Sequence, residues 1–150
     1  MWNIPNMLTM FRIFLVPLLV VVLLTEVPDK EYWGLGIFLL AALTDALDGI
    51  IARRTRTVTT TGAMLDPIAD KLLMSAAFIS LVELQQVAAW MVTLIVGREF
   101  AVTALRLIAL ERKIAISANW LGKAKTTSQI ITVSILIFSL NSDRWHIIAL

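Results

Sequence analysis

The stretch DALDGIIARRTRTVTTTGAMLDPIAD, residues 45–70, contains four of the six aspartates in the 150-residue chain. Asp45 and Asp48 lie at the end of one apolar run, and Asp66 and Asp70 lie at the beginning of the next. Ionisable side chains are costly inside hydrophobic segments and usually mark a functional site. The fold must therefore place these four acids together with groups that balance their charge.

The composition around this stretch is typical of a membrane protein. Hydrophobic residues make up 59% of the chain and the mean hydropathy is +0.84, whereas soluble domains contain roughly half apolar residues. About 20 apolar residues cross a bilayer, and five runs approach this length, at residues 7–24, 32–52, 62–84, 88–110 and 120–140. A sixth begins at WHIIAL, after the connection NSDR, and is cut off at residue 150. We expect an all-α, polytopic membrane helix bundle, one domain over residues 1–150 that is truncated at its C-terminus.

The charges between the runs predict the orientation of the helices. The first connection, EVPDKE, is acidic, whereas the second contains the three arginines of RRTR and the fourth, ERK, is net basic. Lys and Arg favour cytoplasmic loops, so we expect the N-terminus and the second and fourth connections inside. Such a basic face suits anionic headgroups or phosphorylated substrates.

The spacing of the aspartates predicts where they meet. Side chains three or four residues apart share a helix face, so Asp45 pairs with Asp48 and Asp66 with Asp70. With a rise of about 1.5 Å per residue, Asp48 and Asp66 lie at one depth on two antiparallel helices that face each other, and Asp45 and Asp70 lie deeper.

Pro67 gives a further boundary. Proline is tolerated in the first turn of a helix but not in its interior. We therefore expect the third helix to begin near Leu65 or Asp66, after a turn at Gly62.

Four neighbouring carboxylates need compensating cations. The chain has no cysteine, and its one histidine, His146, lies far away in the sequence, so oxygen ligands favour Mg²⁺, Mn²⁺ or Ca²⁺ over zinc. Two such ions about 3.5–4 Å apart are a recurrent arrangement for phosphoryl chemistry. A transport pathway and simple pairing with Arg53, Arg54 and Arg56 remain open alternatives.

The motif D-x-x-D-G-x-x-A-R, eight further residues and G-x-x-x-D-x-x-x-D resembles the signature of the CDP-alcohol phosphatidyltransferases. Its eight positions are Asp45, Asp48, Gly49, Ala52, Arg53, Gly62, Asp66 and Asp70. The segments NIPNMLTMFR, GREF and GKAKT are similar to the bacterial members that make phosphatidylglycerol phosphate. The resemblance implies a six-helix fold in the bacterial inner membrane, with the active site facing the cytoplasm. It also implies transfer of the phosphatidyl group from CDP-diacylglycerol to glycerol 3-phosphate, releasing CMP.

The same resemblance implies roles for individual residues. The four aspartates would hold two divalent cations, Mg²⁺ or Mn²⁺, and Asp70 would also be the general base. The residues expected to bind the CDP-lipid are Asn6, Thr9, Gly49, Arg53 and Thr59. Each also has a plain structural interpretation, as a helix cap, a packing glycine, a positive-inside anchor or a loop residue. Arg12 shares a face with Asn6 and Thr9, and an arginine in an apolar run needs a partner, for which the aspartate site is suitably placed.

The phosphate of glycerol 3-phosphate needs cationic partners. The candidates are Arg98, Arg106, Lys123 and Lys125. Lys123 and Lys125 would point in nearly opposite directions on a helix, and Lys123 is preferred. Arg98 and Glu99 are adjacent and do not face one another on a helix, so we expect them to have different partners.

Two other functions are possible. A cation or proton transporter would use the same carboxylates, but the outer halves of the runs are almost wholly apolar. Alternatively, the protein is a member of the same family that uses serine, inositol phosphate or phosphatidylglycerol as the acceptor alcohol. Expected partners are CDP-diacylglycerol, glycerol 3-phosphate and membrane lipids, with no nucleic acid, and the family resemblance implies a possible homodimer.

Overall fold

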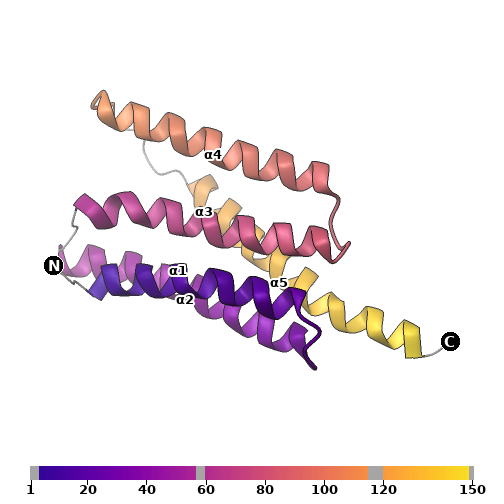
Figure 1. Ribbon diagram of the computed structural model, residues 1–150. Coiled ribbons are helices and arrows are strands. Elements are labelled where there is room, and N and C mark those ends of the chain that lie inside the picture. The colour runs from indigo at the N-terminus through magenta and orange to yellow at the C-terminus, as the bar shows by residue number, and fades with distance from the viewer. Residues whose placement is uncertain (1–3, 57–59, 115–119, 149–150) are drawn as a thin grey trace.

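The computed structural model describes residues 4–56, 60–114 and 120–148, of which residues 60–64 and 141–148 are described by their backbone alone. These residues form five helices and no strands, which confirms the expected all-α fold. The helices are α1 (Ile4–Leu24), α2 (Lys30–Thr55), α3 (Thr60–Glu83), α4 (Ala89–Glu111) and α5 (Trp120–Ile148). Successive helices run in alternating directions, so the start of α1 and the ends of α2 and α4 lie at the same end of the bundle (Figure 1).

Helix α1 lies between α2 and α3. It packs extensively against both, whereas α2 and α3 touch each other little. Helix α5 packs mainly on α2, and α4 packs on α3 at the edge of the bundle. The expectation that the second and third helices face each other directly is therefore wrong, because the first helix separates them.

The core of the bundle begins one turn beyond the aspartates. Leu15, Leu19 and Leu23 recur every fourth residue of α1 and are almost fully buried, as are Phe38 of α2 and the other apolar residues that these leucines pack with. Helices α1 and α2 approach closely at Gly34 of α2, since a Cβ atom added to this glycine would lie 2.5 Å from Leu23 Cδ2 of α1. This packing holds α1 in the position from which its first turns reach the acids.

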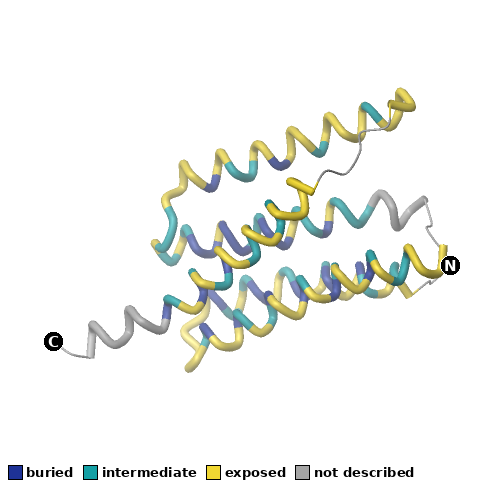
Figure 2. The backbone as a smooth tube through the Cα atoms, turned by 180° about the vertical axis from the view of Figure 1, so that it is seen from behind, coloured by how far each residue is buried: buried dark blue, intermediate teal, exposed yellow. Residues whose placement is uncertain are grey.

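The outer faces of the helices are apolar. Figure 2 shows buried positions on the sides of the helices that face each other and exposed positions on the outside. Large exposed side chains include Phe14, Leu94 and Leu105, a surface suited to lipid rather than water. By length and composition, α1 and α2 are able to cross a membrane. We therefore describe the protein as membrane-associated, and the full set of five spans stays a prediction.

Two expected helix boundaries are wrong. Helix α3 begins at Thr60, and Pro67 lies inside it; membrane helices tolerate an interior proline because neighbouring groups satisfy the freed carbonyl. Helix α5 continues to Ile148 through residues 141–144, where a connection was expected. That segment contains polar residues but neither glycine nor proline, which are the usual helix-ending signals.

Candidate active site

Arg12 of α1 brings three of the four signature aspartates together. Its side chain is fully buried, and its Nη2 atom donates a hydrogen bond of 2.5 Å to Asp48 Oδ2. The Nη1 atom lies 3.0 Å from Asp45 Oδ1 and 3.5 Å from Asp66 Oδ1. The expectation that Arg12 finds its partner at the aspartate site is confirmed.

Thr9 lies one turn before Arg12 on the same face of α1. Its Oγ1 atom is 3.0 Å from Asp66 Oδ1 and 3.4 Å from Asp48 Oδ2, and also 3.0 Å from the carbonyl oxygen of Pro5. A hydroxyl has one proton, so it donates to one of these oxygens at a time. The shared contact places Asp48 and Asp66 at the same depth, as the helix rise predicted.

The two acids at this depth differ in their surroundings. The side chain of Asp48 is 1% exposed, whereas that of Asp66 is 42% exposed. The acid of α2 is therefore enclosed by the bundle, and the acid of α3 reaches its surface.

Asp70 is separated from this group by its own partner. Its Oδ2 atom lies 3.2 Å from Lys71 Nζ. The structure thus gathers three aspartates around Arg12 and places the fourth beside a lysine. Lys71 is not among the residues predicted from the sequence, although an ammonium group inside an apolar run, next to a signature acid, is a signal for it.

A second charged cluster joins α3, α4 and α5. Glu99 is nearly buried, and its Oε2 atom lies 3.0 Å from Lys71 Nζ. Its Oε1 atom lies 3.0 Å from Arg98 Nη1 and forms an ion pair with Lys125. The expectation that Arg98 and Glu99 have different partners is wrong for Arg98, because its long side chain folds back onto its neighbour.

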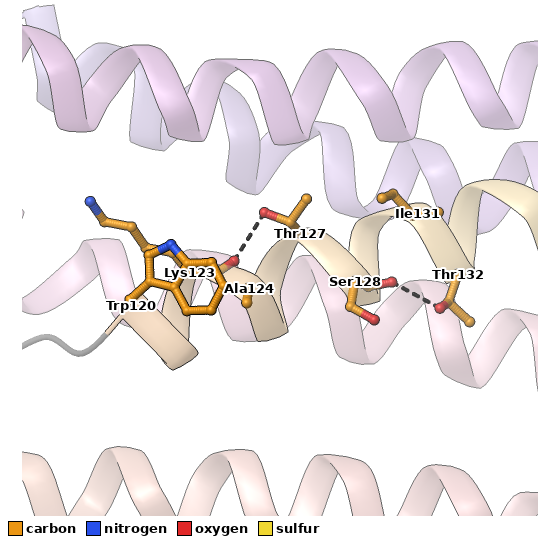
Figure 3. A pocket seen from close by; sticks show the side chains of 7 residues that line it. All are labelled: Trp120, Lys123, Ala124, Thr127, Ser128, Ile131 and Thr132. Atoms are coloured by element: carbon orange, nitrogen blue, oxygen red, sulfur yellow. Dashed lines mark hydrogen bonds between the residues drawn. The ribbon is translucent and has the colours of Figure 1, made fainter.

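The other acceptor-phosphate candidates lie apart from Glu99. Lys123 is exposed and lines an open groove of about 460 Å³ along one face of α5, together with Trp120 and Thr127 (Figure 3). The Thr127 hydroxyl donates to the Lys123 carbonyl at 2.9 Å, so the helix itself uses this donor. Arg106 is exposed on α4. Of the two lysines, the structure brings Lys125 to the charged cluster, whereas the sequence favoured Lys123.

The residues expected to bind the CDP-lipid are only partly gathered. Arg53 Nε donates to the Gly49 carbonyl at 2.9 Å, one turn beyond Asp48. Asn6 is half-buried one turn before Thr9. Thr59 lies outside the described residues.

The donor atoms of the aspartate group suit a hard divalent cation. All are oxygens, and Asp48 Oδ1 is buried without a hydrogen-bond partner among the described residues. Within the described part of the chain, however, no three acidic, histidine or cysteine side chains are arranged to hold a metal ion. The Arg12 guanidinium lies between the acids instead. The ligand atoms of these residues therefore suit a divalent cation, and the cationic side chain of Arg12 already lies among them.

The whole chain carries the features of one enzyme class. The sequence profile of the CDP-alcohol phosphatidyltransferases matches residues 2–150. The chain belongs to this family of phosphatidyl-transferring enzymes, which generally depend on divalent cations.

Two relatives within this family have the same enzyme name. The chain is 43% identical to the CDP-diacylglycerol–glycerol-3-phosphate 3-phosphatidyltransferase of Bacillus subtilis (strain 168), over 91% of this chain and 77% of that protein. It is 37% identical to the enzyme of the same name from Escherichia coli (strain K12), over 93% of this chain and 79% of that protein. The resemblance inferred from the signature is thereby confirmed.

Proposed function

We propose that the protein transfers the phosphatidyl group of CDP-diacylglycerol to glycerol 3-phosphate, giving phosphatidylglycerol phosphate and CMP. The observation that carries this proposal is the convergence of Asp45, Asp48 and Asp66 on one cationic group. A position that attracts a buried guanidinium also suits the metal ions that phosphoryl transfer uses. The two relatives named for this reaction support the same conclusion.

The metal ligands in this proposal are Asp45, Asp48, Asp66 and Asp70. When bound, two Mg²⁺ or Mn²⁺ ions would neutralise the diphosphate and stabilise the CMP that leaves. Asp48 Oδ1 is buried and has no hydrogen-bond partner among the described residues. Asp66 reaches the surface from which the CDP headgroup would enter.

Asp70 is proposed as the general base. It follows Asp66 by one turn of α3 and lies 3.2 Å from Lys71, which also pairs with Glu99. A carboxylate in this position can accept the proton of the acceptor hydroxyl while that oxygen attacks the phosphorus that bears the diacylglycerol. The bond from this phosphorus to CMP breaks as the new one forms.

Substrate binding is assigned to the groups that flank the acids. Asn6, Thr9, Gly49, Arg53 and Thr59 would hold the CDP-lipid. For the acceptor, the cluster of Lys71, Arg98, Glu99 and Lys125 has a formal net charge of +2, which matches a phosphate dianion. Lys71 and Glu99 line a cavity of only about 10 Å³, together with mostly apolar neighbours such as Phe78. This is roughly the space of one water, so the phosphate would part these side chains on binding. Arg106 and Lys123 are proposed to assist from the exposed surface.

The topology supports the membrane orientation that the charges of the connections predict. The acids, the start of α1, the basic end of α2 and the residues Arg112 and Lys113 after α4 lie at one end of the bundle (Figure 1). We place this end at the cytoplasmic face of the bacterial inner membrane, so that the N-terminus of a multi-pass enzyme lies inside. The family resemblance extends the proposal to a homodimer.

The decisive assay follows CMP release by the purified protein with CDP-diacylglycerol and Mg²⁺. We expect turnover with glycerol 3-phosphate and little with serine, inositol phosphate or phosphatidylglycerol. Turnover with another alcohol and none with glycerol 3-phosphate would refute the acceptor. No CMP release with any of these acceptor alcohols, combined with cation flux in proteoliposomes, would instead favour the transporter.

A further inference from the structure

Arg12 is only partly satisfied in its buried position. A guanidinium carries five N–H donors, but the Nε atom of Arg12 makes no hydrogen bond to the described residues. Its Nη1 atom forms ion pairs with Asp45 and Asp66 but no hydrogen bond within the same residues. Asp48 Oδ1 is likewise without a hydrogen bond within the same part of the chain. A buried ion pair is stable only when its remaining donors and acceptors are also paired. The arrangement is therefore poorly suited to be a permanent structural ion pair.

The charges lead to the same conclusion. Asp45, Asp48 and Asp66 carry three formal negative charges, and Arg12 balances one of them. The group retains a formal charge of −2, which attracts a further cation. Such a cation would compete with Arg12 for the same carboxylates, since two positive groups repel at this distance.

The position of Arg12 explains why the acids stay together before a cation arrives. Helices α2 and α3 touch each other little, so their carboxylates would repel each other across α1. The guanidinium contacts acids from both helices. It therefore holds the two halves of the site at one depth.

The geometry points to Arg12 as an exchangeable internal counter-ion: it preorganises the acids of α2 and α3 in the ion-free protein and withdraws from Asp48 and Asp66 when divalent ions bind. This inference rests on the proposed metal site and deepens it. Arg12 is a positioning residue, because it acts through the ligands rather than on the substrate. It stabilises the empty site and weakens ion binding, since each ion must displace it.

The test measures Mn²⁺ binding to the full chain in detergent without substrate, from the electron paramagnetic resonance signal of free Mn²⁺. Arg12→Gln removes the charge, and Arg12→Lys keeps it but loses the multiple contacts. Arg54→Gln is the matched control, because it removes the same charge from an exposed residue at the same end of the bundle. Thermal unfolding in EDTA is recorded for each protein.

We expect Arg12→Gln to unfold at a lower temperature in EDTA and to bind Mn²⁺ about tenfold or more tightly than wild type. Arg12→Lys should bind a few times more tightly, and Arg54→Gln should change neither quantity appreciably. A residue with only a structural role would lower stability without tightening Mn²⁺ binding. If Arg12→Gln does not fold without ions, Arg12→Lys alone decides the matter.

Two results would contradict the inference in different ways. Mn²⁺ binding to wild type, combined with unchanged or weaker binding to the folded Arg12 variants, would refute the role of Arg12 and leave the metal site intact. No Mn²⁺ binding to wild type or to any variant would refute the metal site itself, and the inference with it.

Discussion

The exposure of Asp48 and Asp66 leads to a prediction that separates structural from functional effects. Both are expected metal ligands, and both lie within reach of Arg12 and Thr9. Replacing either with Asn removes a charge without changing the shape of the side chain. We expect both variants to lose Mn²⁺ binding and to lose turnover by about a hundredfold or more. Their stabilities, however, should differ.

The magnitude follows from the contacts of each acid. Asp48 is 1% exposed and accepts the 2.5 Å hydrogen bond from Arg12. Breaking a buried pair by removing one partner costs about 3–5 kcal/mol, and the remaining Asp45 contact places this case near the lower end. Asp66 is 42% exposed and lies 3.5 Å from the guanidinium, so solvent screening limits its contribution to about 0–1 kcal/mol.

The assay is unfolding in detergent with EDTA, so that no bound ion contributes. Asp29→Asn is the matched control, because Asp29 lies in the turn before α2 and makes no side-chain capping hydrogen bond. We expect Asp48→Asn to lose about 3 kcal/mol, and Asp66→Asn to remain close to the control. Equal losses in the two variants would show that Arg12 does not discriminate between these acids as the distances indicate.

Three further predictions concern packing, the acceptor and the cations. Gly34→Val should destabilise the protein by about 1–3 kcal/mol, because its side chain would meet Leu23; Gly36→Val, with nothing within 4 Å of its Cβ, should stay within about 0.5 kcal/mol in the same unfolding assay. Lys125→Gln should raise the KM for glycerol 3-phosphate about tenfold or more through the loss of a charge-assisted contact, whereas Lys123→Gln should change it by less than about threefold; the reverse order would favour the groove on α5 as the phosphate site. EDTA should abolish CMP release, and added Mg²⁺ or Mn²⁺ should restore it; turnover that persists in EDTA would exclude an essential divalent cation.

Local geometry was the part of the site that the sequence predicted well. The depth of Asp48 relative to Asp66 follows from a fixed rise per residue, and the contact of both acids with Thr9 agrees with it. The need of Arg12 for an acidic partner follows equally from the cost of a buried charge. Such arguments hold because they depend on a few covalently linked residues.

The long-range packing of the helices was harder to predict from the sequence. Which helix lies between α2 and α3 depends on how Leu15, Leu19 and Leu23 fit the other helices and on the close approach at Gly34. Apolar periodicity alone does not specify such fits, so the insertion of α1 was missed.

Two local rules also failed because their scope is limited. The rule that adjacent helix positions do not face each other ignores the length of an arginine side chain, which lets Arg98 reach Glu99. The exclusion of proline from helix interiors is relaxed in membrane helices, where neighbouring groups satisfy the freed backbone, and Pro67 lies inside α3.

The central claim is that acids from α2 and α3 share bound cations at one end of the bundle. The most direct test is an anomalous-difference map from crystals of the protein grown with Mn²⁺ and CDP. We predict manganese peaks coordinated by Asp45, Asp48, Asp66 and Asp70, with the Arg12 guanidinium displaced from Asp48. Manganese bound elsewhere, or Arg12 still contacting all three acids beside an ion-free site, would contradict the account.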